Sequence, residues 1–323
     1  MNRTSLLSVV PVAFAMACLA PASFAQSYPT KTVRIIAPVA PGGGVDLVAR
    51  AMADQYTKAL GKTFIVENLS GGGGIIASQT TSRATPDGYT LMVGYVGTHG
   101  TNPAVRKVPY DAINGFTPIA MVGGTPNVLV VHPSIPVKNL KELVEYAKKN
   151  QMSYGSAGQG TLTHLAMEQF KQAADFDAVH AAYRGIAPGL LDLLGGQTQM
   201  MMPGLAAAIG HIRGEKIKPI AVTGAKRHPL TPDVPTFEEQ GYKGFDNVQW
   251  YGIVGPAKMP PAIVKTLNEE TAKALAAPEV RERFAGEALE VMPMTPEEFG
   301  QYIRDDIARW TQLARDRKIE LTE

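Results

Sequence analysis

The sequence predicts an α/β fold of two lobes, in which each lobe is a central, mostly parallel β-sheet flanked by helices. Short β-branched runs alternate with amphipathic helical runs, and the alternation starts again after an apolar stretch near residue 120. Such an alternation favours parallel strands joined by right-handed crossovers. The length agrees with this fold, because about 300 residues usually form two domains.

The first 25 residues have the features of a cleavable secretory signal peptide. Arg3 precedes an apolar stretch over 6–20, and the small-residue site Ser23-Phe24-Ala25 precedes Gln26. The apolar stretch is too short for a membrane anchor and contains a proline. The single cysteine lies in this segment. We therefore expect an exported protein, with a mature chain from Gln26 that has no disulfide and depends on its core for stability.

A first series of predicted strands and helices begins directly after the signal peptide. β-Branched residues indicate the strands, helical spacing of apolar residues indicates the helices, and glycine or proline turns separate them. In chain order these are a strand at 33–36, a helix at 47–60, a strand at 64–66, a short helix from Ile75 and a strand at 90–93.

A second series follows the apolar runs 119–122 and 128–131. Its elements are a helix at 140–149, strands at 152–154, 199–202 and 217–222, and a helix at 162–172. A strand at 251–254 and helices at 261–275 and 296–313 come last, and we expect the final helix to pack on the first lobe. The chain would then cross between lobes twice. This gives lobe 1 as 26–122 and 226–323, and lobe 2 as 123–225.

Two glycine-rich turns, 41–46 and 155–161, each follow a β-type run and precede a helical run. The first N–H groups of a helix have no intrahelical partner and attract anions, and glycine lets a ligand approach the backbone closely. We expect the turns to face each other from separate lobes and to clamp a small carboxylate-like solute. The alternative is that they are tight strand-to-helix connections with no ligand.

Charge and motifs narrow the function. The chain has 31 Lys+Arg and 29 Asp+Glu, so removal of Arg3 leaves 30 against 29 and a mature net charge of +1. No basic stripe appears, which argues against nucleic acid as a partner. The histidines do not have the spacing of metal ligands. The sequence at 56–63 ends like a nucleotide-binding P-loop, but Tyr56 replaces its first glycine, which argues against nucleotide binding. One enzyme alternative remains, a serine hydrolase that uses Ser156 with His164 or His180 as the base. The sequence matches its nucleophile-elbow motif G-x-S-x-G only in part, because Tyr154 replaces the first glycine.

Eight blocks of sequence, in order along nearly the whole mature chain, resemble one family. They are PVAPGGGVD at 38–46, VEN at 66–68, PDGYTL at 86–91, NP at 102–103, YGSAG at 154–158, His180 with YRG at 183–185, LLGGQ at 193–197 and PDVPT at 232–236. The family is the Bug-type solute-binding receptors of tripartite tricarboxylate transporters. The resemblance implies a periplasmic, two-lobed Venus flytrap receptor without catalytic activity, metal or cofactor. It further implies a monomer that binds a small organic carboxylate and delivers it to membrane permease subunits.

The resemblance and the two turns together give a set of expected ligand-binding residues. They are Gly42, Gly43, Gly44, Asp46, Gly97, Thr98, His99, Ser156, Ala157, Gly158, Gly160, Thr161, His164, Tyr183 and Arg184. Val45 stands where the family commonly has Ser or Thr, so we expect the first turn to bind through its backbone and the second to add hydroxyl groups.

Within this set several roles stay open. Asp46 can cap the helix that it begins, and 95–101 is expected to be a loop that senses the remainder of the ligand. Ser156, Thr161 and His164 can alternatively be capping or packing residues, and Arg184 a surface ion-pair partner. A periplasmic sensor subunit for a signalling partner would share the same fold.

Overall fold

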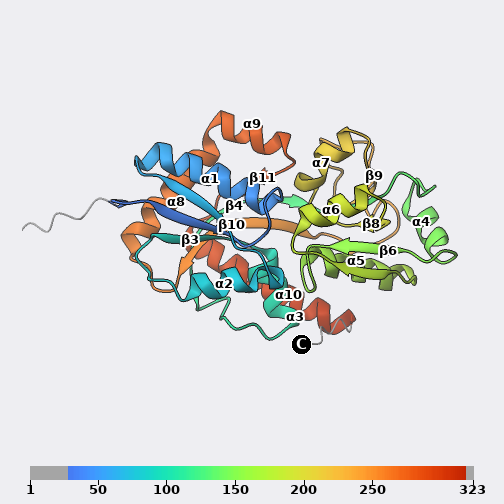
Figure 1. Cartoon of the computed structure of the whole chain (residues 1–323), viewed down its shortest axis with the longest axis horizontal. Helices are drawn as coiled ribbons and strands as arrows, with labels where there is room; N and C mark the ends of the chain where they lie inside the picture. Colours follow the sequence, from blue (N-terminus) through green and yellow to red (C-terminus); the bar gives the residue numbers. More distant parts are fainter. Residues whose placement is uncertain (1–27, 318–323) are drawn as a thin grey trace, which may run out of the picture.

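The computed structural model describes residues 28–317, and the expected signal peptide, 1–25, lies outside them. Two sheets with flanking helices lie side by side along the long axis of the molecule (Figure 1). We call the larger sheet and its helices lobe 1, and the smaller sheet and its helices lobe 2. The predicted two-lobed α/β fold is confirmed.

Lobe 1 contains both ends of the described chain. Its strands are β1 (Val33–Ala37), β2 (Phe64–Asn68), β3 (Thr90–Tyr95), β4 (Phe116–Pro126), β10 (Val248–Pro256) and β11 (Glu290–Val291), in the order β11-β4-β10-β3-β1-β2. Its helices are α1 (Gly44–Leu60), α2 (Ile75–Ser82), α3 (Asn102–Val105), α8 (Pro261–Ala276), α9 (Pro278–Gly286) and α10 (Pro296–Arg317), with the short turns η1 (Gly72–Gly74) and η2 (Gly97–Thr101).

Lobe 2 is a single continuous stretch of elements. Its strands are β5 (Val128–Val131), β6 (Ser153–Ser156), β7 (Val179–Ala182), β8 (Met200–Met201) and β9 (Lys218–Val222), in the order β7-β6-β8-β5-β9. Its helices are α4 (Leu140–Ala147), α5 (Leu162–Ala174), α6 (Ile186–Leu194) and α7 (Leu205–Arg213).

The sheets are mixed, so the expectation of mostly parallel sheets is wrong. In lobe 1, β2, β1 and β3 are parallel, but β10 is antiparallel to both β3 and β4. In lobe 2, β7, β6 and β8 are parallel, while β5 is antiparallel to β8 and β9. The physical reason is the exchange of chain between lobes: β4, β5, β9 and β10 flank the two crossings and pair without a crossover helix.

Both crossings between the lobes pass through one hydrogen-bonded group of buried residues. Asn127, between β4 and β5, donates its N–H to Thr223 Oγ1 at 2.8 Å and accepts the N–H of Thr223 at 2.8 Å. The hydroxyl of Thr223 donates to the carbonyl oxygen of Asn247, just before β10, at 2.7 Å. These three residues tie the first crossing to both ends of the second. We call them the hinge triplet.

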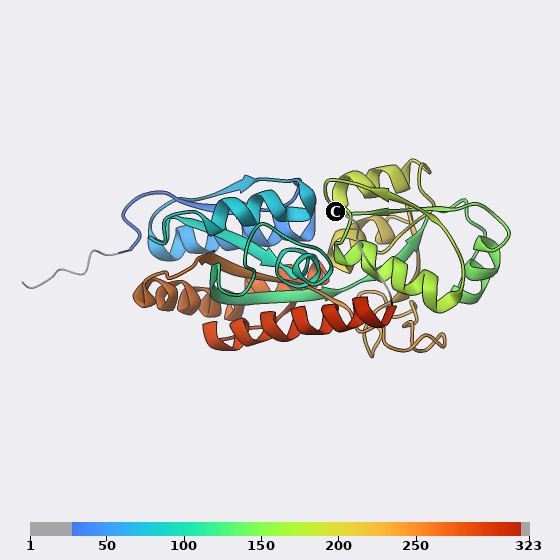
Figure 2. The ribbon, with the colours of Figure 1, turned by 90° about the horizontal axis from the view of Figure 1, so that it is seen from below.

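The connection over 223–247 packs against lobe 2 (Figure 2). Thr236 forms a parallel bridge with Val222 of β9, and the ring of Phe237 lies 5.4 Å from Phe170 of α5. Phe237 also stacks on Phe245 at 4.4 Å. These contacts favour a lobe boundary near 247, and we propose it in place of the boundary at 225.

Helix α10 packs on lobe 1, as the sequence predicted, and runs along its underside towards lobe 2 (Figure 2). Trp250 of β10 donates its indole N–H to Asp306 Oδ2 at 2.8 Å and meets Phe299 edge to face. This side of β10 is therefore fixed against α10. Because side chains alternate along a strand, Gln249 and Tyr251 point to the other face.

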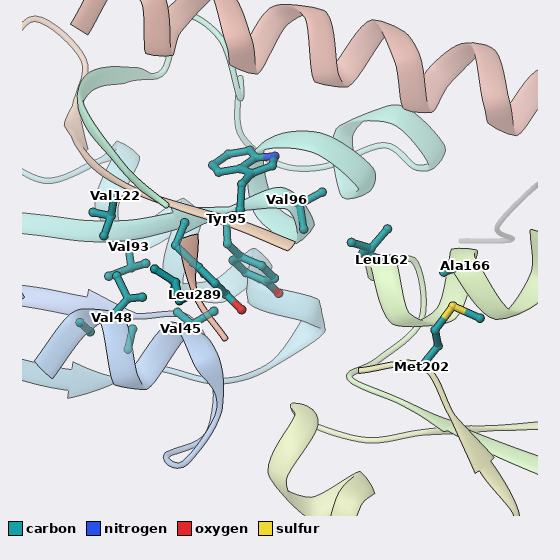
Figure 3. Packing of buried hydrophobic residues seen from close by; sticks show 14 of the residues in the cluster. Val45, Val48, Val93, Tyr95, Val96, Val122, Leu162, Ala166, Met202 and Leu289 are labelled. Atoms are coloured by element: carbon teal, nitrogen blue, oxygen red, sulfur yellow. The ribbon is translucent and has the colours of Figure 1, made fainter. Parts of the chain in front are cut away.

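One apolar core cluster includes residues of both lobes. Figure 3 shows part of this cluster, with Val45 and Tyr95 of lobe 1 on one side and Leu162, Ala166 and Met202 of lobe 2 on the other. The lobes are thus in apolar contact in this structure. Within residues 28–317, no helix is long and apolar enough to cross a membrane.

Candidate functional site

The parallel strands of both lobes point their carboxyl ends towards the space between the lobes. Helix α1 begins there after β1, and α5, α6 and α7 begin there after β6, β7 and β8. Ligands of open α/β sheets bind at this edge. A cavity lies at this position, with residues of both lobes in its wall. The lining residues are Val39, Gly43, Gly44, Val45, Tyr95, Ala157, Ile186, Gly204, Ala207, Gln249 and Tyr251.

Three helix N-termini border this cavity within the described chain. Gly43 and Gly44 begin α1, Ile186 is the first residue of α6, and Gly204 precedes α7. The volume open to a water-sized sphere is about 20 Å³, which is room for roughly one water molecule. The lobes are therefore nearly closed on each other.

The starts of α1 and α6 meet across the lobes. A Cβ atom added to Gly42 would lie 3.7 Å from Ala187 Cβ, and one on Gly43 would lie 3.9 Å from Ile186 Cβ. Both helix ends carry partial positive charge, so they repel each other at this separation. An anion between them would remove this repulsion.

The first glycine turn is held by Asp46, which does not cap α1 in the usual way. Its Oδ2 accepts the N–H of Gly42 at 3.1 Å and Arg50 Nε at 3.0 Å, and its Oδ1 accepts Asn68 Nδ2 at 2.8 Å. Burial alone raises the pKa of Asp46, but the hydrogen bonds from Arg50, Asn68 and Gly42 outweigh it and hold the pKa below its usual value. Asp46 thus fixes the turn from behind.

The backbone of the first turn keeps donors for a ligand. The first bond of the α1 ladder is donated by Leu47 N–H to the carbonyl oxygen of Gly43 at 3.0 Å. The N–H groups of Gly44 and Val45 precede this bond and have no intrahelical acceptor. Gly44 must be glycine for a further reason, since a methyl group there would overlap the hydroxyl of Tyr251.

The second glycine turn satisfies most of its own donors. Ala157 N–H donates to Thr163 Oγ1 at 2.9 Å, Gly158 N–H to Ser156 Oγ at 3.1 Å and Gly160 N–H to His164 Nδ1 at 3.2 Å. The hydroxyl of Thr161 donates to the carbonyl oxygen of Gly158 at 2.7 Å. Thr161 therefore has no proton left for a ligand carboxylate, which removes one of the two hydroxyl groups expected from this turn.

Ser156 belongs to a stack of rings behind the second turn. Its Oγ lies 2.7 Å from His180 Nε2, and the His180 ring stacks against His164, with ring centroids 4.1 Å apart, and against Tyr154, with ring centroids 4.9 Å apart. Burial lowers the pKa of His180, and burial together with the charge of His180 lowers the pKa of His164 to about 4. Both rings are neutral at pH 7. Ser156 itself is fully buried.

The two glycine turns border the same cavity but have different partners across the lobes. The first turn meets the start of α6, whereas the second meets η1, where a Cβ on Gly73 would lie 3.5 Å from Thr161 Cγ2. Gly73 is held by Tyr95, whose hydroxyl donates to its carbonyl oxygen at 3.2 Å, and by Asn102 Nδ2 at 2.9 Å. The glycine run at 70–74 is therefore a structural part of the closed interface.

The segment 95–101 was expected to be a loop, but it is a buried helical turn. It continues from β3 into η2, and every residue of it is buried. Thr98 Oγ1 accepts the N–H of Tyr95 at 3.2 Å, and His99 lies 4.5 Å from the Phe116 ring, so that burial lowers the pKa of His99 to about 3. Tyr110 and Phe116 explain the difference, because both rings pack against His99 and the Tyr110 hydroxyl donates to the carbonyl oxygen of Thr98. Gly97 is packed against the ring of Tyr95.

The two remaining expected residues lie at the edge of lobe 2. Tyr183 donates its hydroxyl to Asp192 Oδ2 at 2.7 Å, and Arg184 is exposed. A different arginine lies between the lobes. Arg106, directly after α3, has buried Nε and Nη2 atoms with no hydrogen-bond partner among residues 28–317. Its charge acts on Tyr95 of lobe 1 and on His164 of lobe 2.

Sequence reasoning missed the starts of α6 and α7, together with Arg106, Gln249 and Tyr251. The two helix starts carried a usable signal, because Gly185 and Gly204 each follow a strand and precede a helical run. Gln249 and Tyr251 carried no such signal, because they lie within strand β10 of lobe 1, far along the chain from both glycine turns. Within the described part of the chain, no group of three or more His, Cys, Asp or Glu residues is placed to hold a metal ion.

Comparison with known proteins decides the family. The model of the tripartite tricarboxylate transporter family receptor matches residues 48–319. The chain belongs to this family. Its members are periplasmic solute-binding receptors of the Bug type, so this chain is a solute-binding receptor of a tripartite tricarboxylate transporter.

Solved structures of such receptors are similar over nearly the whole chain. The periplasmic binding protein BugD is 34% identical with a TM-score of 0.87, over 91% of this chain and 99% of BugD. Rpa4515 of Rhodopseudomonas palustris, solved with adipate, is 31% identical with a TM-score of 0.87, over 90% and 98%. MatC of the same organism, solved with malate, is 31% identical with a TM-score of 0.85, over 88% and 99%.

Proposed function

We propose that this receptor captures a small organic carboxylate between its two lobes in the periplasm and delivers it to the permease subunits of its transporter. The chain would act as a monomer after removal of residues 1–25, without catalysis and without a metal or cofactor. Similarity to receptors solved with adipate and malate supports a carboxylate as the ligand class.

The observation that carries the proposal is the convergence of helix N-termini from both lobes on one cavity. Helix α1 of lobe 1 and helices α6 and α7 of lobe 2 all begin at its wall. Three ends of the same sign favour an anion, and closure brings more of them onto it. A neutral solute would leave their mutual repulsion in place.

The expected contacts are enough for useful affinity. A partly buried helix end stabilises an anion by up to about 2 kcal/mol, and a hydrogen bond to a charged group contributes about 1.5–3 kcal/mol. Three ends and three or four bonds therefore reach the roughly −8 kcal/mol of micromolar binding after the costs of ordering. Backbone donors at Gly43 and Gly44 would supply part of these bonds.

Arg106 would supply the one full positive charge. Burial lowers its pKa, yet a guanidinium stays protonated in proteins. Two nitrogen atoms of this half-buried side chain are themselves buried without a partner among residues 28–317, and a buried donor left unpaired is costly. A ligand carboxylate near α3 and α5 would pair with it. Arg184 would then contribute only through long-range attraction.

We divide the expected ligand-binding residues into two groups. Direct contacts would come from Gly42, Gly43, Gly44 and Ala157. Support of the two turns and of the closed interface would come from Asp46, Gly97, Thr98, His99, Ser156, Gly158, Gly160, Thr161, His164 and Tyr183, and Arg184 would act only through long-range attraction.

The test is isothermal titration calorimetry against a panel of mono-, di- and tricarboxylates, with a neutral sugar as the negative control. We expect at least one carboxylate to bind with micromolar Kd. Arg106→Met should weaken it at least tenfold, whereas the matched variant Arg184→Met should change affinity by less than about threefold. Binding of the sugar alone would overturn the proposal, and a larger loss with Arg184→Met would reverse the assignment of the charge.

The serine hydrolase is the second candidate, because Ser156 Oγ and His180 Nε2 are 2.7 Å apart. Complete burial of Ser156 and its acceptance of the Gly158 N–H argue against a nucleophile. Incubation with ester substrates tests it. Turnover that disappears in Ser156→Ala would establish the hydrolase in place of a receptor that only binds.

A further inference from the structure

One buried side-chain atom in the cavity wall has no hydrogen-bond partner among the described residues. Gln249 is 6% exposed, lines the cavity, and its Oε1 is buried with no hydrogen bond among residues 28–317. A buried amide oxygen that is left unpaired destabilises the folded protein. A glutamine used only for packing could be an apolar residue at no such cost.

The position of Gln249 is fixed from three sides. It lies next to Trp250, which is anchored to Asp306, and it pairs in register with Thr125 of β4. Thr125 Oγ1 in turn accepts the N–H of Ala206 in the first turn of α7, at 3.1 Å. A Cβ on Gly204 would lie 3.4 Å from the Cβ and Cγ of Gln249. The Gln249 side chain therefore lies beside the start of α7, in contact with the opposite lobe.

No donor of the surrounding wall is hydrogen-bonded to Gln249 Oε1 in the described part of the chain. The hydroxyl of Tyr95 is used on Gly73, at 3.2 Å. The other lining residues of lobe 2 are Ala157, Ile186, Gly204 and Ala207, none with a polar side chain. A ligand held in the cavity would supply the partner that Gln249 Oε1 lacks.

The chemistry of that partner follows from the charge of the site. The three helix N-termini make the cavity positive, and no acidic side chain among residues 28–317 lines it. An ammonium group on the ligand would be repelled there. A hydroxyl group is neutral, and it both donates and accepts, so it pairs with the amide of Gln249 in either orientation.

We propose that Gln249 is a specificity-determining residue that selects a hydroxylated carboxylate, by hydrogen bonding to the ligand hydroxyl while the helix N-termini hold the carboxylate. This inference rests on the proposed carboxylate-binding function and names the substrate class of the same site.

The test uses pairs of acids that differ only by one hydroxyl group. Calorimetry compares lactate with propionate, malate with succinate, 2-hydroxyglutarate with glutarate and 2-hydroxyadipate with adipate. The pair whose members bind most tightly is used to test the inference. We expect the wild-type protein to bind the hydroxylated member at least tenfold more tightly. Gln249→Leu should remove most of this preference and leave the plain acid within about threefold. The exposed Gln301→Leu is the matched control and should keep the wild-type preference.

The outcomes separate the inference from the proposed function. Equal binding of both members of the tightest pair by the wild-type protein overturns the role of Gln249 while carboxylate binding stands. Tighter binding of aspartate than of malate overturns the hydroxyl in favour of an ammonium group. If no carboxylate binds, both fall. The wild-type comparison decides even where Gln249→Leu does not fold, and a thermal melt shows whether it does.

Discussion

The two glycine turns have similar sequences and opposite hydrogen-bonding states. In the first turn, the Asp46 carboxylate accepts the N–H of Gly42, and the N–H groups at the start of α1 have no acceptor within the helix. In the second turn, the side chains of Ser156, Thr163 and His164 accept the backbone donors of the loop. The first turn has donors to offer, whereas the second has used most of its own.

This difference separates binding from framework. Changes in the first turn should act mainly on ligand affinity, and changes in the second mainly on the free energy of unfolding. Four experiments can break or sharpen this division, and they follow in order of the effect expected.

The largest effect is expected for Gly44→Ala. A methyl group there overlaps the Tyr251 hydroxyl, so the start of α1 must move away from the cavity. We expect carboxylate affinity to fall at least a hundredfold by calorimetry, which is about 2.7 kcal/mol. Tyr251→Phe in the same chain removes the hydroxyl and should recover part of the affinity. Wild-type affinity in Gly44→Ala would show that the first turn does not touch the ligand.

The second effect concerns pH and the second turn. The folded-state pKa of His164, about 4, lies below its ordinary value of 6.5. The unfolded chain therefore binds a proton first, and the stability contributed by neutral His164 is present above pH 6.5 and lost as the pH falls to about 4. From pH 7 to pH 5 the loss is about 2 kcal/mol.

Urea denaturation at pH 7 and pH 5 measures this loss for wild type and His164→Asn. The pH effect should be smaller in the variant by roughly the same 2 kcal/mol, while the buried His99 contributes equally to both proteins. The charged and titratable groups around His164 are His180, Glu168, Lys171 and Arg106. An unchanged pH effect in His164→Asn would assign it to another of the groups that titrate in this range.

The third effect is expected for Thr163→Val, which takes the acceptor away from Ala157 N–H. An unsatisfied buried N–H should lower the free energy of unfolding by about 2 kcal/mol, with affinity within threefold of wild type. Thr80→Val, on the exposed face of α2, is the matched control and should change stability by less than about 0.5 kcal/mol. A large loss of affinity with normal stability would show that the second turn donates hydrogen bonds to the ligand, beyond the packing contact expected from Ala157.

The smallest effect is a gain. Val45 lines the cavity at the first turn, and Val45→Thr would place a hydroxyl group there. One added hydrogen bond, less the cost of burying the hydroxyl, should raise carboxylate affinity about threefold in calorimetry. Weaker binding would place the ligand away from Val45.

Sequence reasoning went furthest where one segment carries its own pattern. The strand at 33–36, the helix at 162–172 and the final helix over 296–313 were all predicted from local periodicity and are present. It failed where position depends on distant residues. The burial of His99 depends on Phe116, and the place of Gln249 depends on a strand that returns after lobe 2.

The candidate site shows the same division. The glycine turn at 41–46 could be predicted as a helix start at a strand end, and it is one. The hydrogen bond from the Thr161 hydroxyl to the carbonyl oxygen of Gly158 could not be predicted, because the packing around a turn sets the direction of its side chains. The unpaired Arg106 was missed for the same reason.

The hinge triplet gives the receptor a single pivot. Because Asn127, Thr223 and Asn247 join both crossings at one point, a small change of backbone dihedral there moves the far rim of a lobe through a much longer arc. A longer ligand would then hold the lobes at a wider angle. The distance between the two rims would therefore depend on ligand length, and the permease could distinguish ligands by this distance.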